Sequence, residues 1–331
     1  MPGVLGLDIG GANLKAAHSG GNVRVQPFPL WKQPGELTEV LRELVDSMPA
    51  ADVLAVTMTG ELCDCFDSKR QGVLAILDAV SAVAGKRSIR VWTISDGFAD
   101  LAAAREKPLQ VAAANWLALA TFAGRLIPEG TGLVIDVGST TTDIIPIVGG
   151  RPTPKGRTDS ERLRSLELVY TGVRRTPLCA VLGAGVAAEF FATTLDVNLV
   201  LEQIAEDPAD NNTADGRPAT RAAAHARLAR MVCADAESMS PQETVKLAER
   251  ALLRQVYQLT MAFDHVSRSL LEPPRTVVLA GEGEFLARLV LGQQNSFRIG
   301  RVISLSETLG PQKSRAACAY ALTELAGSDF K

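Results

Sequence analysis

Two short segments of this 331-residue chain each place an aspartate, a glycine corner and small polar residues at the end of an apolar run. The first is 7–15, with the sequence LDIGGANLK, and the second is 135–143, with the sequence IDVGSTTTD. A strand that ends in Asp-x-Gly and then turns exposes consecutive backbone N–H groups, which bind phosphate oxygens. The aspartate adds a carboxylate beside the phosphates, which suits Mg²⁺ held partly through water. The two segments therefore predict a site for a phosphate compound and a divalent cation.

The residues of the two turns divide by chemistry. Glycine lets the backbone approach a ligand closely, and hydroxyl or amide side chains beside it add hydrogen-bond donors. The predicted phosphate-binding residues are Gly10, Gly11, Asn13, Gly138, Ser139, Thr140 and Thr141. The predicted metal ligands are Asp8, Asp136 and Asp143, and Lys15 adds a further side-chain donor to the first turn.

The elements around the first turn alternate between strands and helices. Apolar runs bounded by turn residues predict strands, and apolar residues three and four apart predict helices. We expect a strand from Val4 to the Gly10 corner, further strands at 14–19, 23–28, 52–58 and 89–94, and helices at 37–45, 69–84, 96–106 and 112–126.

The strand–turn–strand pattern returns after a connector at 128–132. The distance between the two aspartates, 136 minus 8, is 128 residues, which suits two tandem domains and is too long for a solenoid repeat. We therefore expect α/β domains at 1–128 and 129–331, with a helical insertion at about 196–268 in the second. After it we expect a strand from Thr276 into the Gly281-Glu282-Gly283 turn, a helix at 284–291, a strand at 301–305 and a closing helix at 313–325.

Composition excludes several classes of protein. A formal net charge of −3 and an aromatic content of 5% disfavour a nucleic-acid-binding surface. No run of about 18 apolar residues is present to span a bilayer, and the first residues lack the basic region of a signal peptide. The five cysteines and three histidines show no metal-ligand spacing. These features predict a reduced, cytoplasmic protein without a nucleic-acid or membrane partner, and they leave homo-oligomerisation open.

The two turns, together with the strand end 278–283 (VLAGEG), resemble the three phosphate and nucleoside motifs of the actin, sugar kinase and Hsp70 superfamily. The resemblance covers the chain apart from the helical insertion. It implies two tandem ribonuclease H-like domains around a central cleft, with the two hairpins facing each other across a phosphorylated ligand.

A narrower resemblance is carried by the first turn and by four further segments. These are 57–62 (TMTGEL), 114–116 (ANW), 165–177 (SLELVYTGVRRTP) and 213–220 (TADGRPAT), which resemble the hydantoinase/oxoprolinase-related proteins of tetrahydromethanopterin-linked C1 metabolism. That group implies an ether-forming transferase of methanofuran or methylofuran biosynthesis. It joins a furanylmethyl diphosphate to a tyramine-type phenol such as γ-glutamyltyramine and releases diphosphate, with Mg²⁺ and without a requirement for ATP.

The implied reaction assigns roles to further residues. Asp8, Lys15 and Asp136 are the expected catalytic residues of the turns, with Lys15 as the cationic contact to the diphosphate. A phenol with a pKa of about 10 needs a base or a desolvated pocket. Glu61, Asp96 and Asp159 are the candidate bases, with a solvated loop acid as the alternative for Glu61. The remaining predicted substrate-binding residues are Asn115, Arg157, Tyr170, Arg174, Arg175, Gly281, Glu282 and Gly283; surface arginines and core packing of Tyr170 are the alternatives.

Two other functions compete with the transferase. An ATP-dependent small-molecule kinase, or a hydantoinase/oxoprolinase-like hydrolase, would use the same fold with adenosine held at Gly281-Glu282-Gly283. A nucleotide-sensing scaffold would need no catalysis, and the acids Asp8, Asp136 and Asp143 together with Lys15 speak against it.

Overall fold

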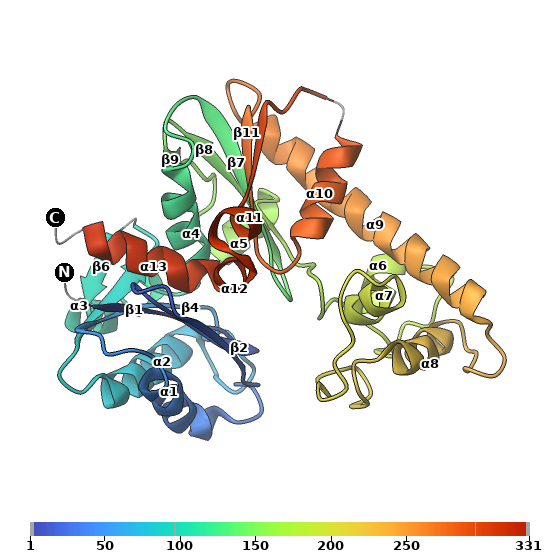
Figure 1. The fold of residues 1–331 in the computed structure, drawn as a ribbon, viewed down its shortest axis with the longest axis horizontal. Helices are drawn as coiled ribbons and strands as arrows, with labels where there is room; N and C mark the ends of the chain where they lie inside the picture. The colour runs from blue at the N-terminus through green and yellow to red at the C-terminus, as the bar shows by residue number, and fades with distance from the viewer. Residues whose placement is uncertain (1–2, 96, 295, 329–331) are drawn as a thin grey trace.

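The computed structural model describes residues 3–95, 97–294 and 296–328 as two lobes, each built on one mixed β-sheet, with a helical extension on the second (Figure 1). Both sheets contain six strands. Five consecutive strands of the first sheet, β3-β2-β1-β4-β5, correspond in order to β10-β8-β7-β11-β12 of the second, so the expected duplication of an α/β unit is confirmed.

The first sheet has the order β3-β2-β1-β4-β5-β6. Strands β1, β4 and β5 are parallel, and β2, β3 and β6 are antiparallel to their neighbours. The strands are β1 Val4–Ile9, β2 Asn13–His18, β3 Val23–Pro27, β4 Val53–Met58, β5 Ser88–Thr93 and β6 Gly97–Asp100. The helical segments are η1 Pro34–Glu36, α1 Leu37–Asp46, α2 Lys69–Ala84, α3 Leu101–Glu106, η2 Pro108–Gln110 and α4 Asn115–Gly124.

The second sheet has the order β10-β8-β7-β11-β12, with β9 also pairing β8. Its strands are β7 Thr131–Val137, β8 Thr142–Val148, β9 Arg151–Pro152, β10 Leu168–Val169, β11 Thr276–Ala280 and β12 Arg301–Ser304. The helices are α5 Asp159–Arg164, α6 Leu178–Leu182, α7 Thr194–Val200, α8 Arg221–Met231, α9 Pro241–Ser267, α10 Glu284–Gln293, α11 Leu305–Leu309, α12 Pro311–Arg315 and α13 Ala317–Ser328.

Alternation along the central strands decides where the two aspartates point. Leu5, Leu7 and Ile9 of β1 belong to the core that α1 and α2 close, so Asp8 lies on the opposite face, because successive side chains of a strand alternate. In the same way Ile135 of β7 packs into the core of α9 and α10, and Asp136 lies on the other face. Both acids therefore face the layer of helices that the two lobes share.

That shared layer consists of α4 and α13, which pack on each other between the two sheets (Figure 1). α13 contacts β1, β2 and β4, although it closes the chain, and α4 contacts β7, β8 and β9, although it precedes them. The approach is close: a Cβ on Gly6 would lie 2.0 Å from the Ala319 carbonyl oxygen. The domain boundary at 128/129 stays a prediction, since each lobe lends a helix to the other.

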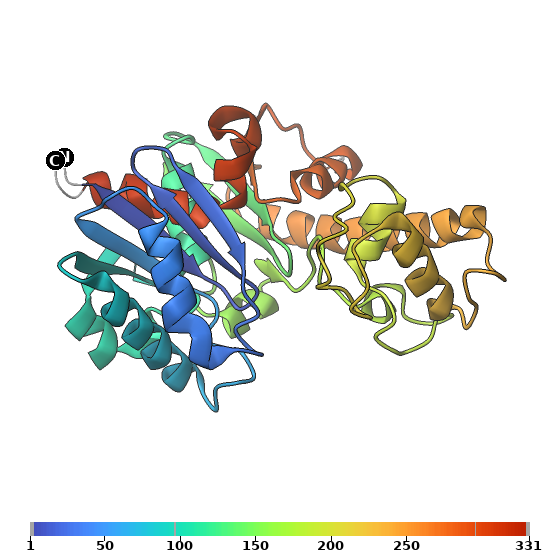
Figure 2. The same ribbon diagram turned by 60° about the horizontal axis from the view of Figure 1, so that its bottom comes forward.

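The helical insertion projects from the second lobe, and α7, α8 and the N-terminal half of α9 pack around a core of its own (Figures 1 and 2). In Figure 2 it lies well to one side of both sheets. Its core is lined by Val197, Leu228 and Leu247, while the C-terminal half of α9 packs on the second sheet.

Two predicted helices are wrong in part. Residues Gly97–Asp100 form β6, antiparallel to β5, and the helix begins only at Leu101 because the Asp100 side chain caps it by accepting from the Ala103 amide at 2.8 Å. The closing helix at 313–325 is two helices, α12 and α13, which meet at Ala316.

The cysteines and the helices can be compared with what the composition predicts. All five cysteines are free. Across the described residues, the helices lack the combination of length and apolar character that a membrane crossing requires.

Candidate active site

The two hairpin corners have the same shape. The Gly10 amide donates to the Asn13 carbonyl at 3.0 Å. At the equivalent place in the second lobe, the Gly138 amide donates to the Thr141 carbonyl at 2.9 Å. The two amides at the tip of each corner donate to no group in the described part of the chain: they belong to Gly11, Ala12, Ser139 and Thr140. Each corner thus presents free N–H groups, which is what an anion site of this kind needs.

The aspartates before the corners are short of partners. Asp8 is buried, and within the described residues its Oδ1 has no hydrogen-bond partner. Burial raises the pKa of Asp8 against the opposing charge of Lys15. Burial, reinforced by the nearby Asp143 carboxylate, raises the pKa of Asp136 to about 7. Two desolvated carboxylates of this kind favour a cation beside them.

The Lys15 ammonium interacts electrostatically with carboxylates of both lobes. It stands opposite Asp8 across the β1–β2 ladder, with its Nζ 3.8 Å from Asp8 Oδ2. Burial alone would lower the pKa of the Lys15 ammonium, but Asp8 and, from the second lobe, Asp136 and Glu282 raise it above the ordinary value. The fold therefore brings the two predicted turns to one place.

The third predicted motif closes this place from the side of β11. Gly281 has a φ of +85°, and a Cβ there would lie 2.5 Å from Asp136 Oδ1, so glycine is required both by its conformation and by the close approach. Glu282 Oε2 lies 3.9 Å from Nη2 of Arg315 on α12. A Cβ on Gly283 would lie 2.4 Å from Val137, so this loop packs directly on the second turn.

The third predicted metal ligand is engaged elsewhere. Asp143 Oδ1 accepts a hydrogen bond from Arg162 Nη2 at 2.6 Å, and both residues are buried. The Arg162 guanidinium also lies over the ring of Trp116, 3.9 Å from its centre. Of the residues that the structure describes, no three His, Cys, Asp or Glu side chains are gathered to hold a metal ion. The predicted three-carboxylate site is therefore not formed, and Asp8 and Asp136 remain as candidate ligands.

Glu61 lies in a loop that rests on the first turn. The Gly60 amide donates to the Ile9 carbonyl at 3.0 Å, and a Cβ on Gly60 would lie 3.2 Å from the Gly10 carbonyl oxygen. Glu61 itself is 1% exposed, and its Oε2 finds no hydrogen-bond partner among the described residues. Burial raises the pKa of Glu61 to about 7. A buried carboxyl that titrates near neutrality is suited to accept a proton.

Lys69 connects Glu61 to the second lobe. Its Nζ lies 3.9 Å from Glu61 Oε1 and donates to Asp159 Oδ2 at 3.0 Å. Two of the three predicted bases, Glu61 and Asp159, thus share one ammonium group. Asp159 is held by the closer contact, which leaves Glu61 as the acid that is freer to exchange a proton.

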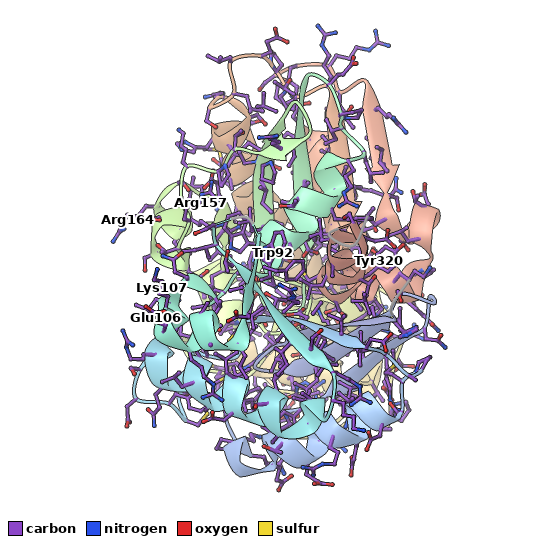
Figure 3. The ribbon with its side chains drawn as sticks, turned by 90° about the vertical axis from the view of Figure 1, so that its left-hand side faces the viewer. Trp92, Glu106, Lys107, Arg157, Arg164 and Tyr320 are labelled. Carbon is purple, nitrogen blue, oxygen red and sulfur yellow. The ribbon has the colours of Figure 1, made fainter. Side chains whose placement is uncertain are left out.

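Two arginines also join the lobes. Arg157 donates from Nη1 to the Ile94 carbonyl at 2.9 Å, and Figure 3 shows it above Glu106 and Lys107 of the first lobe. The Arg175 guanidinium lies 4.3 Å from the centre of the Trp31 ring. The predicted clamps are therefore at the boundary between the lobes, although their present partners belong to the protein.

The second turn is braced by the segment 171–175. The Val173 amide donates to the Gly138 carbonyl at 3.0 Å, and the Arg174 amide donates to the Ser139 carbonyl at 2.9 Å. A Cβ on Gly172 would lie 2.5 Å from the Gly138 carbonyl oxygen, so the two segments touch backbone to backbone. These bonds occupy the Gly138 and Ser139 carbonyls, and the Ser139 and Thr140 amides keep no partner among the described residues.

The helical insertion in turn holds that bracing segment. Gln255 of α9 donates from Nε2 to the Thr171 hydroxyl and to the Gly172 carbonyl, both at 2.9 Å. Asn198 of α7 donates to the Val173 carbonyl at 2.8 Å. The Arg174 side chain pairs with Asp210 in the loop of the insertion, so an anion would have to compete with that carboxylate.

A family model described as hydantoinase/oxoprolinase matches residues 52–323 of the chain. The chain belongs to the hydantoinase/oxoprolinase family. The match covers Glu61, the second turn and the Gly281–Gly283 loop, and it ends within α13.

Two archaeal relatives carry the same name, "(4-{4-[2-(gamma-L-glutamylamino)ethyl]phenoxymethyl}furan-2-yl)methanamine synthase". The relative from Methanocaldococcus jannaschii is 32% identical over 97% of both chains. The relative from Methanococcus vannielii is 31% identical over 58% of this chain and 89% of its own length.

Solved structures show how widely the fold is used. The PilM–PilN type IV pilus biogenesis complex matches 97% of each chain with a TM-score of 0.51 and 13% identity. Nucleotide-free acetone carboxylase matches 97% of this chain and 70% of its own, with a TM-score of 0.58 and 10% identity. At such identities the likeness shows the fold alone, which is the expected pair of actin-like domains.

The remaining predicted residues of this hydantoinase/oxoprolinase family member are more scattered. Asn115 is half-buried at the start of α4. Tyr170 is 63% exposed at the end of β10, so it is not packed in the core. Asp96 lies outside the described residues. Neither of two shallow surface hollows, one beside Glu202–Glu206 and one between β5 and α3, reaches the turns.

Sequence reasoning missed several residues that the fold brings in. Lys69, Trp31, Arg162 and Arg315 each contact a predicted residue. Cys318 is buried in α13, and its thiol pKa is raised first by burial and then by Asp8 and Asp136, which places the start of α13 near both acids. None of these residues carries a local motif, because their partners are distant in the chain.

The donors that are present fit a magnesium ion. Mg²⁺ is commonly held by one or two carboxylates together with substrate phosphates and water. Asp8 supplies a buried oxygen without a partner among the described residues. Asp136, like Asp8, interacts electrostatically with Lys15. The free amides of both turns would face the phosphates of the same ligand.

Proposed function

We propose that this protein joins a furanylmethyl diphosphate to a tyramine-type phenol, forming an ether and releasing diphosphate. The observation that carries the proposal is a relative, 32% identical across 97% of both chains, named for a product in which a phenoxymethyl group joins a phenol to a furan. The acceptor is γ-glutamyltyramine or a similar phenol. The product belongs to methanofuran- or methylofuran-type cofactor biosynthesis for tetrahydromethanopterin-linked C1 metabolism.

The reaction exchanges one carbon–oxygen bond for another. The bond between the furanylmethyl carbon and a diphosphate oxygen breaks, and a bond between that carbon and the phenol oxygen forms. Because the furan ring delocalises positive charge on this carbon, departure of diphosphate is the main barrier. The free amides of the two turns and the Lys15 ammonium stabilise the negative charge that builds on the leaving group.

The phenol proton needs an acceptor. Glu61 supports this role because it is buried beside the first turn, has an oxygen without a partner among the described residues, and has a pKa of about 7. A phenol has a pKa of about 10, so transfer becomes favourable as the carbon–oxygen bond forms and the phenol oxygen loses basicity. Lys69 and Asp159 hold the loop and the second lobe in register beside it.

Asp8 and Asp136 would hold the divalent cation. When bound, Mg²⁺ neutralises part of the diphosphate charge and so favours its departure. Asp8 orients Lys15 across the ladder, and the Gly281 approach keeps Asp136 directed at the same place.

The test is a reconstitution with purified protein and Mg²⁺. A furanylmethyl diphosphate and a tyramine-type phenol are supplied together and separately, with mass spectrometry for the ether and a coupled assay for diphosphate. We expect both products only when both substrates are present. Hydrolysis of ATP or transfer of its phosphate to a small molecule, with no ether from the substrate pair, would reject the transferase in favour of a kinase or hydrolase.

A further inference from the structure

An exposed apolar stripe runs along α9. Leu253, Tyr257 and Met261 are 65%, 62% and 52% exposed. Residues four apart in a helix lie on one face, so the three form a continuous line. Single exposed apolar residues are ordinary, whereas a contiguous set marks an interaction surface.

The other sides of α9 are already covered. Val256, Leu259 and Phe263 pack on the second sheet and α10, and Leu247 and Ala251 pack on α7 and α8. The three side chains of the stripe stay more than half exposed when all the described residues are in place. The stripe is therefore a helix face without a partner within the described chain.

A charged residue lies at each end of the stripe, and the spacing of the five residues is symmetric about Tyr257. Arg250 precedes it and Asp264 follows it, so the positions 250, 253, 257, 261 and 264 are separated by three, four, four and three residues. The two end residues have opposite charge. Arg250 is exposed, and Asp264 is half-buried.

We propose that this stripe is the interface of a homodimer, in which α9 packs antiparallel on α9 of a second copy. A two-fold axis at Tyr257 brings Tyr257 onto the partner's Tyr257 and Leu253 onto the partner's Met261. The same axis places Arg250 opposite the partner's Asp264 at both ends. Charge complementarity thus selects a second copy of this chain as the occupant.

The extent of the stripe sets the strength of the dimer. From Arg250 to Asp264 the helix rises about 21 Å. Beyond these residues, exposed Lys246 would meet the partner's Arg268, and this like-charged pair ends the contact. One helix pair of this length is smaller than a standard interface. We therefore expect reversible association in the micromolar range rather than a permanent dimer.

Disulfide trapping tests the arrangement directly. In a Cys233→Ser background, which removes the exposed native thiol, Tyr257→Cys should form an intermolecular disulfide under mild oxidation because the axis passes through this residue. Gln242→Cys is the control on the same helix. Its two copies would lie about 45 Å apart, so it should not cross-link. Equal cross-linking of both variants would overturn the proposal.

Sedimentation velocity on the full chain supplies the second measurement. We expect a dimer fraction that grows with concentration up to about 100 μM. Tyr257→Glu or Arg250→Asp should weaken association at least about tenfold, and Arg250→Asp combined with Asp264→Arg should restore it, with unchanged circular dichroism in each case. A wild-type chain that stays monomeric throughout, or a swap that restores nothing, would overturn the proposal and leave the face to a different protein.

Discussion

The two hairpin corners share a backbone and differ in what stands across the ladder from each aspartate. Asp8 faces Lys15, whereas Asp136 faces Asp143. The Lys15 ammonium lies 3.8 Å from Asp8, and its pKa is also raised by the charge of Asp136 in the second lobe, while Asp143 is hydrogen-bonded to the buried Arg162. The duplicated unit thus keeps one anion-binding shape twice. In the described structure, a lysine stands across the ladder from the aspartate of the first corner, and an aspartate stands there in the second. The first corner is suited to act on a leaving group, and the second is suited to hold it.

The corners also differ in what supports them. The first rests on a loop of its own lobe, through Gly60. The second rests on the segment 171–175, which Asn198 and Gln255 of the insertion hold in place. The insertion is therefore part of the second corner's structure, and changes at a distance should affect the second corner more than the first.

The largest effect is expected at the buried pair of the second corner. Arg162→Met leaves the Asp143 carboxylate buried without its guanidinium, so we expect a loss of about 3–5 kcal/mol in the free energy of unfolding. Urea denaturation followed by circular dichroism measures it. Adding Asp143→Asn to Arg162→Met should recover much of the loss because no charge then stays buried.

Lys15, the cation that pairs with an aspartate in the first corner, is the comparison for Arg162. Lys15 is partly exposed and lies 3.8 Å from Asp8 without a hydrogen bond, so Lys15→Met removes a weaker interaction than Arg162→Met. Because Asp8 stays buried, we expect a loss of about 1–2 kcal/mol in the same free energy, together with reduced diphosphate release. Similar destabilisation by both variants would mean that the two corners do not divide their tasks as their contacts indicate.

The sequence predicts the corners better than their partners. The repeat at a distance of 128 residues predicts both turns and both sheets, because apolar strands and glycine corners are local signals. Nothing local pairs Lys69 with Asp159, which lie 90 residues apart, or separates Asp143 from the other two acids. The helix expected at 96–106 failed for a related reason: Asp100 looks like an interior helical residue until β5 is present to pair with 97–100.

The next largest effect is expected on turnover at Asp8. Asp8→Asn removes a carboxylate that orients Lys15 and is a candidate ligand for the cation, and we expect kcat to fall at least about 100-fold, as for other groups that stabilise charge in the transition state. Asp78→Asn, on the exposed face of α2, is the control of the same chemistry. Near wild-type turnover of Asp8→Asn would refute the proposal that the first corner acts on the leaving group.

A variant of Glu61 tests whether the loop that supports the first corner also takes part in proton transfer. Since burial raises its pKa to about 7, kcat of the wild type should rise with pH up to about 7, where the carboxylate becomes ionised. Glu61→Gln should lose at least about tenfold in kcat at about pH 8, together with this rise. A pH profile that keeps its shape in the variant would assign the proton to another group.

The same carboxyl should make the unliganded protein less stable at higher pH. A folded-state pKa of about 7, above the ordinary 4.5, means that the stability is present below about pH 4.5 and is lost as pH rises to about 7. Glu61→Gln should therefore unfold at a higher temperature than the wild type at about pH 8, and at a similar temperature at about pH 4.5. Calorimetry at the two pH values measures the difference.

The smallest effect is expected at Gln255, which acts on the second corner through Thr171 and Gly172. Gln255→Met keeps the volume but removes two hydrogen bonds, each worth about 1 kcal/mol at most. Because the bracing segment aligns the turn rather than touching the reacting atoms, we expect KM for the diphosphate to rise about fivefold with little change in kcat. Gln258→Met, at an exposed position three residues further along α9, should change neither constant. A fall in kcat without a change in KM would instead mean that the insertion acts on the chemical step, and the division between a corner that reacts and a corner that holds would then fail.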